Sequence, residues 1–241
     1  MLYGMQQHNN IQDKHWKRIV EHPVVAVLVA NDPRKAVSAC KALVDGGVPA
    51  VELALRTPNA LACLSAVRES VPEMLVIAGT VLTTEQVDAV KAAGGEAAVA
   101  PGCNPTVVKH ALDAGMSFAP GVCTPSDVEV GLELGCTFLK FFPAEAAGGL
   151  GYLKSMAAPY AHLGVQFLPL GGLRQHHVAG YLESNYVATV GGTWICPSDL
   201  LDADDYGEVE RRAREAADAA VAATSGGGPA AGGDAKAGGK A

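Results

Sequence analysis

The sequence has no uninterrupted apolar run long enough to cross a membrane, although 49% of its 241 residues are hydrophobic. A membrane-spanning helix needs about 20 apolar residues in succession. Residues 1–14 also lack the basic-then-apolar order of a secretory signal. We therefore expect a cytoplasmic protein without membrane contact, and the length suits one domain with a large core.

An excess of basic residues is also missing. The chain has 18 Lys and Arg against 25 Asp and Glu, a net charge of −7. Nucleic-acid and anionic-membrane surfaces need a basic patch, so neither partner is expected. A small anionic substrate stays open, because one pocket can be locally positive.

Clustered cysteines and histidines are absent as well. The six cysteines are scattered, with no C-x-x-C and no pair of histidines at ligand spacing. A disulfide framework or a zinc site would show such clustering. We expect reduced, mostly buried thiols, with no metal and no cofactor.

What the chain does contain is a repeat of short apolar runs at steps of roughly twenty-odd residues. The runs are continuous, as in strands buried on both faces. They are Val24–Val29, Ala50–Leu55, Met74–Ala78, Ala97–Ala100, Ser117–Ala119, Cys136–Lys140, Val165–Leu170 and Val187–Val190.

Helix-length stretches with recognisable ends lie between these runs. Capping side chains precede a proline in Asp32-Pro33, Thr57-Pro58, Asn104-Pro105 and Thr124-Pro125, and Thr83 with Gln86 forms a capping-box pattern. Glycines stand where helices should stop, at Gly46-Gly47, Gly94-Gly95, Gly115 and Gly135.

Eight strand–helix repeats predict an α/β protein built as a single (β/α)8 barrel, with a helix before the first strand. An open doubly wound sheet is disfavoured because no glycine-rich fingerprint follows the first strand. The expected parts are a flexible extension at 1–14, the barrel at 15–223 and a disordered Gly/Ala-rich tail at 224–241. Within these limits, Asn9–Glu21 is the candidate first helix and Asp204–Ala223 the last.

One lysine, Lys140, interrupts the sixth apolar run. A lysine is costly to bury as a cation, and burial favours the neutral amine that attacks a carbonyl group. The alternative is a lysine that extends past the strand end into solvent.

Glu52 and Arg56 fall on the same face of the second run, because side chains alternate along a strand. Inside the barrel, Glu52 would supply the general acid and base for chemistry at an amine. Arg56 would hold a substrate carboxylate. A structural Glu52–Arg56 ion pair is the alternative.

Loops at the carboxyl ends of the strands carry the remaining candidates. Gly79-Thr80 ends the third run, Leu170-Gly171-Gly172 ends the seventh, and Gly191-Gly192-Thr193-Trp194 follows the eighth. The last two loops are where such barrels bind phosphate. His176-His177 has no carboxylate pattern nearby and is interpreted as surface histidines.

Four segments together resemble the 2-keto-3-deoxy-6-phosphogluconate (KDPG) aldolase family, which overlaps with 4-hydroxy-2-oxoglutarate (KHG) aldolase. They are Phe138–Glu145, Glu52–Thr57, Ala78–Leu82 and Pro101-Gly102, and the resemblance extends over about residues 15 to 220.

This resemblance implies a metal-free class I aldolase, a lyase that forms a homotrimer. It cleaves KDPG to pyruvate and glyceraldehyde 3-phosphate, and also KHG to pyruvate and glyoxylate. By position, Lys140 resembles the Schiff-base lysine and Glu52 the proton-transferring base. Arg56 and Thr80 resemble the pyruvate-carboxylate contacts, and Gly171, Gly172 and Thr193 the phosphate site.

Two positions depart from the family pattern. Leu170 replaces a threonine associated with the choice of sugar epimer, and Thr193 replaces a serine but keeps the hydroxyl. An aldolase for the galactonate epimer therefore stays open. So do a metal-dependent aldolase or epimerase, although no histidine falls within an expected strand, and a non-catalytic sugar-phosphate-binding barrel.

Overall fold

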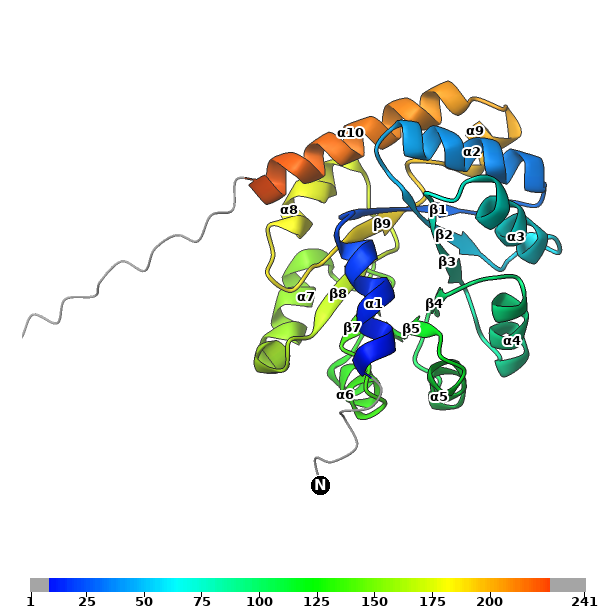
Figure 1. Ribbon diagram of the computed structural model, residues 1–241. Coiled ribbons are helices and arrows are strands. Elements are labelled where there is room, and N and C mark those ends of the chain that lie inside the picture. The colour runs from blue at the N-terminus through cyan, green and yellow to red at the C-terminus, as the bar shows by residue number, and fades with distance from the viewer. Residues whose placement is uncertain (1–8, 226–241) are drawn as a thin grey trace, which may run out of the picture.

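The computed structural model describes residues 9–225. Parallel strands alternate with helices along the chain, and the helices form an outer layer around the strands (Figure 1). The strands are β1 (Val24–Leu28), β2 (Ala50–Ala54), β3 (Leu75–Gly79), β4 (Ala97–Val99), β5 (Ser117–Ala119), β6 (Gly121–Val122), β7 (Phe138–Phe141), β8 (Gln166–Pro169) and β9 (Val190–Gly192).

The main helices are α1 (Asn9–Val20), α2 (Pro33–Asp45), α3 (Ala60–Ser70), α4 (Thr84–Ala92), α5 (Pro105–Asp113), α6 (Pro125–Glu133), α7 (Gly149–Ala157), α8 (Val178–Leu182), α9 (Ser198–Asp202) and α10 (Tyr206–Ser225). Two 3-10 helices, η1 (Ala158–Leu163) and η2 (Gln175–His177), complete the series. Helix α1 takes in residues 9–14 of the expected N-terminal extension. Residues 1–8 and residues 226–241 of the expected tail lie outside the described part of the chain.

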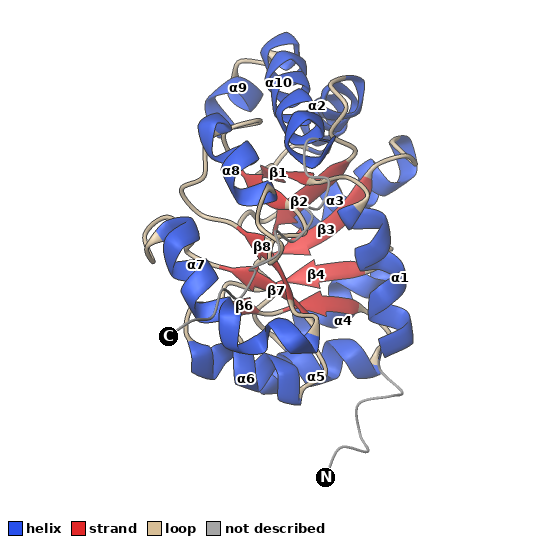
Figure 2. Cartoon of the chain, turned by 90° about the vertical axis from the view of Figure 1, so that its left-hand side faces the viewer, coloured by secondary structure: helices blue, strands red, loops and turns tan. Residues whose placement is uncertain are grey.

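The strands pair in two parallel sheets, not in the single eight-stranded sheet that we expected. A curled six-stranded sheet has the order β5-β4-β3-β2-β1-β9, and a three-stranded sheet has the order β6-β7-β8. Figure 2 shows the strands in the interior, with helices on the outside. The observed fold is therefore α/β with a curled parallel sheet.

The division falls at Pro120, between β5 and β6. Proline has no backbone N–H to donate to a neighbouring strand. Before it, β5 pairs with β4; after it, β6 pairs with β7, and the Pro120 carbonyl accepts a bond from the Lys140 N–H (2.9 Å). A side chain at Gly121 would lie 2.2 Å from the Pro101 carbonyl, so only glycine fits this approach. The short strand β6 was not expected from the sequence.

Two faces of the strands bury two groups of side chains. Val51 and Leu53 of β2, like Leu139 and Phe141 of β7, pack outward with the helices. Ala50 and Phe138, in the same strands, belong to a second group on the inner side. Because side chains alternate along a strand, Glu52 and Lys140 fall on this inner side.

Helix α1 closes one end of the inner space. Trp16 stacks on Phe138, the first residue of β7, with the ring centroids 4.6 Å apart. His15 Nδ1 lies 3.0 Å from the hydroxyl of Ser117, the first residue of β5. The helix therefore covers the amino ends of the strands, and their carboxyl ends are left to form the site.

The predicted N-cap residues were confirmed for four helices. Asp32, Asn104 and Thr124 cap their helices, and Thr83 forms the capping box with Gln86. The prediction that Thr57 is an N-cap residue was wrong. Its hydroxyl donates to the Ala30 carbonyl (2.6 Å), and α3 begins later, with Asn59 as its N-cap residue.

The glycine pair after the eighth run was also misplaced. Gly191 and Gly192 lie inside β9 and pair with β1, whereas we expected them in the following loop. A side chain at Gly191 would lie 2.9 Å from the Val25 carbonyl and 2.7 Å from a methyl carbon of Leu170. Close strand packing, and not a turn, requires this glycine.

Among residues 9–225, no helix is both long enough and apolar enough to span a membrane.

Candidate active site

A cavity of about 600 Å³ opens at the carboxyl ends of the strands. Every residue expected at the site borders it: Glu52, Arg56, Thr80, Lys140, Leu170, Gly171, Gly172 and Thr193. The sequence did not single out several other bordering residues, among them Val27, Phe142, Arg174, Asp199 and Arg212.

A buried ion pair between Lys140 and Glu52 forms the floor of the cavity. Lys140 Nζ donates to both carboxylate oxygens of Glu52, at 3.0 and 3.1 Å. Lys140 is 5% exposed and Glu52 is 2% exposed. The amine also lies 5.3 Å from the centre of the Phe142 ring. Lys140 therefore does not extend into solvent, and it has a proton acceptor within hydrogen-bond distance.

This pair excludes the structural Glu52–Arg56 pairing that the sequence left open. Among the described side chains, Arg56 makes no ion pair, and its exposed side chain borders the cavity above the end of β2. A guanidinium in this position is available for a carboxylate of a bound ligand.

Thr80 borders the cavity from an unusual backbone conformation. Its φ of 61° lies in the left-handed region, which a β-branched residue rarely adopts. Such conformations persist where the surrounding structure imposes them, and they cluster at functional sites. Here the conformation follows directly after β3 and places a hydroxyl at the rim.

The loop after β8 has two successive glycines in the left-handed region, Gly171 (φ 97°) and Gly172 (φ 86°). Both positions are crowded, since a side chain would meet Phe142 at 3.0 Å or Glu145 at 2.8 Å. Consecutive amides in such a turn can surround an anion. Thr193, exposed just after β9, adds a hydroxyl to the same part of the cavity.

His177 corrects one of the sequence interpretations. His176 is exposed, as expected, but His177 Nε2 lies 3.3 Å from a carboxylate oxygen of Glu145. His177 Nδ1 accepts a bond from the Arg174 N–H (2.9 Å), so Nε2 carries the ring proton when the imidazole is neutral. No local pattern of residues indicated this contact, because Glu145 comes from the loop after β7.

Tyr181 completes this contact between the two loops. Its hydroxyl donates to Glu145 (2.6 Å). Burial, and then the hydrogen bond and charge of Glu145, raise the pKa of Tyr181, so the phenol keeps its proton. Together, Tyr181 and His177 hold the β7 loop against the glycine loop after β8.

The amine of Lys140 and the carboxylate of Glu52 are together suited to one type of chemistry. A buried amine can add to a carbonyl carbon, and the adjacent carboxylate can accept and return protons. Among residues 9–225, no three His, Cys, Asp or Glu side chains are grouped to hold a metal ion.

Comparison with known proteins identifies relatives that are aldolases. The family model for KDPG and KHG aldolase matches residues 16–212. A KHG/KDPG aldolase of Escherichia coli (strain K12) is 39% identical over 212 residues, which cover 86% of this chain and 99% of that relative.

Two similar solved structures carry ligands. A 2-keto-3-deoxy-6-phosphogluconate aldolase of Zymomonas mobilis ZM4 with 3-phosphoglycerate is 37% identical, with a TM-score of 0.77, and covers 88% of this chain and 96% of that one. A KDPG aldolase of Legionella pneumophila, with pyruvate captured as a covalent carbinolamine, is 31% identical, with a TM-score of 0.78, and covers 86% and 97%. The chain therefore belongs to the KDPG and KHG aldolase family.

Proposed function

We propose that this protein is a class I aldolase that cleaves KDPG to pyruvate and glyceraldehyde 3-phosphate through a Schiff base on Lys140. The observation that carries the proposal is the buried Lys140–Glu52 pair on the floor of the cavity. A buried pair of this kind contributes little to stability compared with apolar residues of similar volume, so a chemical role explains it better.

In the first step, Glu52 takes a proton from the Lys140 ammonium and leaves a neutral amine. The amine attacks the C2 keto carbon, and the keto oxygen becomes the hydroxyl of a carbinolamine. In this addition, Glu52 returns its proton to the keto oxygen. A second proton then passes through Glu52 from the nitrogen to the hydroxyl, which leaves as water, so that the product is a protonated imine and Glu52 is again a carboxylate. Pyruvate held as a carbinolamine in the Legionella pneumophila relative supports this sequence of events.

In the second step, Glu52 removes the proton from the C4 hydroxyl. The C3–C4 bond breaks, its electrons pass into the iminium as an enamine, and C4 leaves as the aldehyde carbon of glyceraldehyde 3-phosphate. Protonation of the enamine at C3 and addition of water release pyruvate and regenerate Lys140. One carboxylate within 3.1 Å of the amine can serve both proton transfers.

The remaining residues are assigned to binding. Arg56 and Thr80 would hold the pyruvate carboxylate, Arg56 through two parallel hydrogen bonds. The amides of Gly171 and Gly172 and the hydroxyl of Thr193 would hold the distal phosphate. Their common position along one cavity supports this division.

Leu170 favours a second candidate substrate, the galactonate epimer. It is 3% exposed and forms an apolar wall between Lys140 and the glycine loop. An apolar wall discriminates weakly between positions of a hydroxyl group. We therefore assign KDPG as a substrate without assigning strong selectivity between the two epimers.

We also propose that the two sheets together form one closed (β/α)8 barrel. Two observations support closure. Only Pro120 separates β5 from β6, and Phe167 of β8 bridges Val187, shortly before β9. A homotrimer, as the family resemblance implies, would be tested by light scattering of the purified protein.

The test of function is pyruvate release, measured side by side with both phosphorylated epimers and with KHG. Cleavage of KDPG with saturation kinetics supports the proposal. Release from KHG but not from either phosphorylated acid would overturn the substrate assignment, and release from none would overturn the activity.

A further inference from the structure

More positively charged side chains border the cavity than the proposed chemistry at Lys140 and the carboxylate contact of Arg56 require. Arg56, Lys140, Arg174 and Arg212 border the cavity, against the carboxylates Glu52 and Asp199. Lys140 and Glu52 compensate each other. Three cations, Arg56, Arg174 and Arg212, then border the cavity against one carboxylate, Asp199, and Arg212 is also paired with Glu208, which does not border the cavity.

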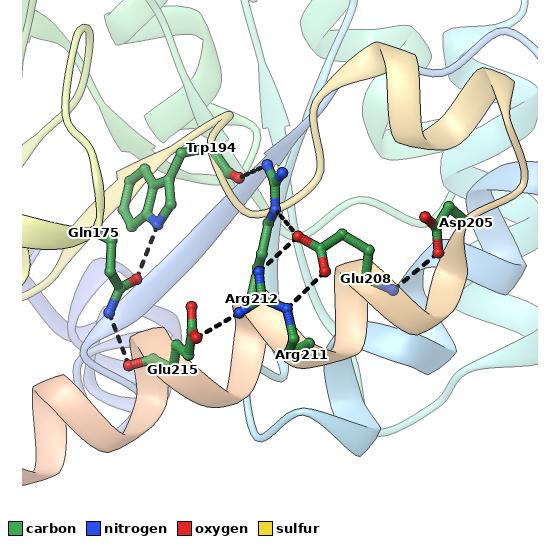
Figure 3. Close-up of polar contacts among 7 residues, drawn as sticks. All are labelled: Gln175, Trp194, Asp205, Glu208, Arg211, Arg212 and Glu215. Carbon is green, nitrogen blue, oxygen red and sulfur yellow. Dashed lines mark hydrogen bonds and ion pairs between the residues drawn. The ribbon is translucent and has the colours of Figure 1, made fainter.

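Arg212 comes from α10, the last of the described helices, and reaches the loop after β9. Its Nε donates to Glu208 (2.8 Å), and its Nη1 donates to the Trp194 carbonyl (2.9 Å). Trp194 directly follows Thr193. Figure 3 shows the guanidinium extended from α10 toward Trp194, with Glu208 beside it.

These two bonds use only part of the guanidinium. Arginine has five N–H donors in one plane, so the group still has donors for a ligand in the cavity. Both contacts fix its orientation before a ligand arrives, which lowers the entropy cost of binding. Hydrogen bonds from Arg211, then from Arg212, lower the pKa of Glu208 to about 2, so the supporting carboxylate stays ionised at neutral pH.

A second network holds the same corner. The Trp194 indole N–H donates to Gln175 (3.2 Å), and the Gln175 amide donates to the Glu215 carbonyl of α10 (2.8 Å). Figure 3 shows that Gln175, Trp194 and α10 form one connected group. Helix α10 thus supports the loops after β8 and β9 as well as supplying a cation.

Arg174 provides the second positive charge. It lies two residues after Gly172, and its N–H is fixed by His177 Nδ1. Its exposed side chain makes no ion pair with any other described residue. A phosphate monoester carries nearly two negative charges at neutral pH, which two guanidinium groups match better than amides alone.

We infer that Arg212, together with Arg174, binds the distal phosphate and makes the enzyme selective for phosphorylated substrates. The inference rests on the proposed function and adds the residues that set this selectivity. Arginine suits the role because its planar fork matches phosphate oxygens bidentately.

The chain offers a closely matched control for Arg212. Arg214, two residues further along α10, also donates to a glutamate four positions earlier (Glu210, 2.6 Å) and to a backbone carbonyl (Asp45, 3.0 Å). It does not border the cavity. Arg212→Gln and Arg214→Gln therefore remove the same charge and the same kinds of contact, and only the first touches the site.

The first experiment is calorimetric titration with inorganic phosphate, which needs no catalysis. Arg212→Gln should weaken phosphate binding about 10- to 100-fold, the usual effect of losing a charge-assisted hydrogen bond. Arg174→Ala should weaken it less, because its side chain is exposed and screened by salt. Arg214→Gln should leave it within about two-fold. Absence of phosphate binding in the native protein, or equal binding in all variants, would overturn the inference.

The second experiment compares kcat/KM for KDPG and for its unphosphorylated analogue 2-keto-3-deoxygluconate. Arg212→Gln should lower the value for KDPG about 10- to 100-fold and leave the analogue nearly unchanged, and Arg212→Lys should restore part of the loss. Equal losses for both substrates would mean that Arg212 only supports the Trp194 loop, which overturns the inference. Phosphate binding lost in Arg212→Gln, in a native protein that forms no imine with pyruvate, would overturn the aldolase proposal and leave Arg212 as an anion-binding residue.

Discussion

Gly79 leaves the space that the Glu52 carboxylate occupies. A Cβ atom at position 79 would lie 2.3 Å from Glu52 Oε1 and 2.6 Å from its Cγ, on the neighbouring strand. Glu52 is buried between β3 and Lys140, so it has no room to move aside without leaving the amine. A single missing methyl group on β3 thus fixes the position of the proposed base.

Gly79→Ala should therefore lower kcat by about 10²-fold or more, the lower limit for loss of a positioned acid–base group. The control is Gly151→Ala on α7, where a Cβ would meet no atom within 4 Å. Steady-state kinetics and melting temperatures of both variants check this. Normal kcat in Gly79→Ala would show that the exact position of Glu52 does not matter.

Glu52→Gln should lower kcat for KDPG cleavage about 10²–10⁴-fold. The amide keeps the size and can still accept a bond from Lys140, but it cannot take a proton. Imine formation with pyruvate should slow as well, because the same carboxylate deprotonates the amine. Near-normal turnover, with a lowered melting temperature alone, would make Glu52 a structural partner of Lys140.

Arg56→Lys should raise the KM for pyruvate in the synthetic direction and leave kcat less affected. The charge stays, but the bidentate hydrogen bonds to the carboxylate are lost, at a cost of about 10-fold in binding. Arg56 has no ion pair within the described chain, so the fold should not change. A KM equal to that of the native enzyme would remove Arg56 from the carboxylate site.

Leu170→Thr should sharpen the preference for the gluconate epimer over the galactonate epimer. A hydroxyl in the wall can hydrogen-bond a substrate hydroxyl, and a misplaced substrate then leaves polar groups unpaired. Leu170 packs with the inner apolar group, so some loss of stability is also expected. Comparing kcat/KM for both epimers in the two proteins tests this. A native enzyme that is already strongly selective, and unchanged by the substitution, would place stereochemical control elsewhere.

The sequence was sufficient for the chemical groups that lie on strands. Alternation along β2 placed Glu52 inside the barrel, the position of Lys140 in an apolar run indicated a buried amine, and the structure joins the two within 3.1 Å. A carboxylate near the amine was expected from the chemistry, but the ion pair itself was not predicted, because 88 residues separate the two side chains and strand order decides which of them meet.

The features that the sequence analysis missed or predicted wrongly depend on contacts between segments that are distant in the sequence. Thr57 has a capping side chain but bonds the carbonyl of Ala30 instead. His177 meets a carboxylate from another loop. Arg212 looks like any surface arginine of an amphipathic helix until α10 is placed against the loop after β9. No local pattern of residues encodes these three contacts.

The central claim is the covalent role of Lys140, and borohydride reduction in the presence of pyruvate tests it most directly. The account predicts that the peptide containing Lys140 gains the mass of one reduced pyruvyl group. It also predicts that Lys140→Arg gains none, because a guanidinium does not form the carbinolamine. A pyruvyl adduct on a different lysine, or no adduct in the native protein, would contradict it.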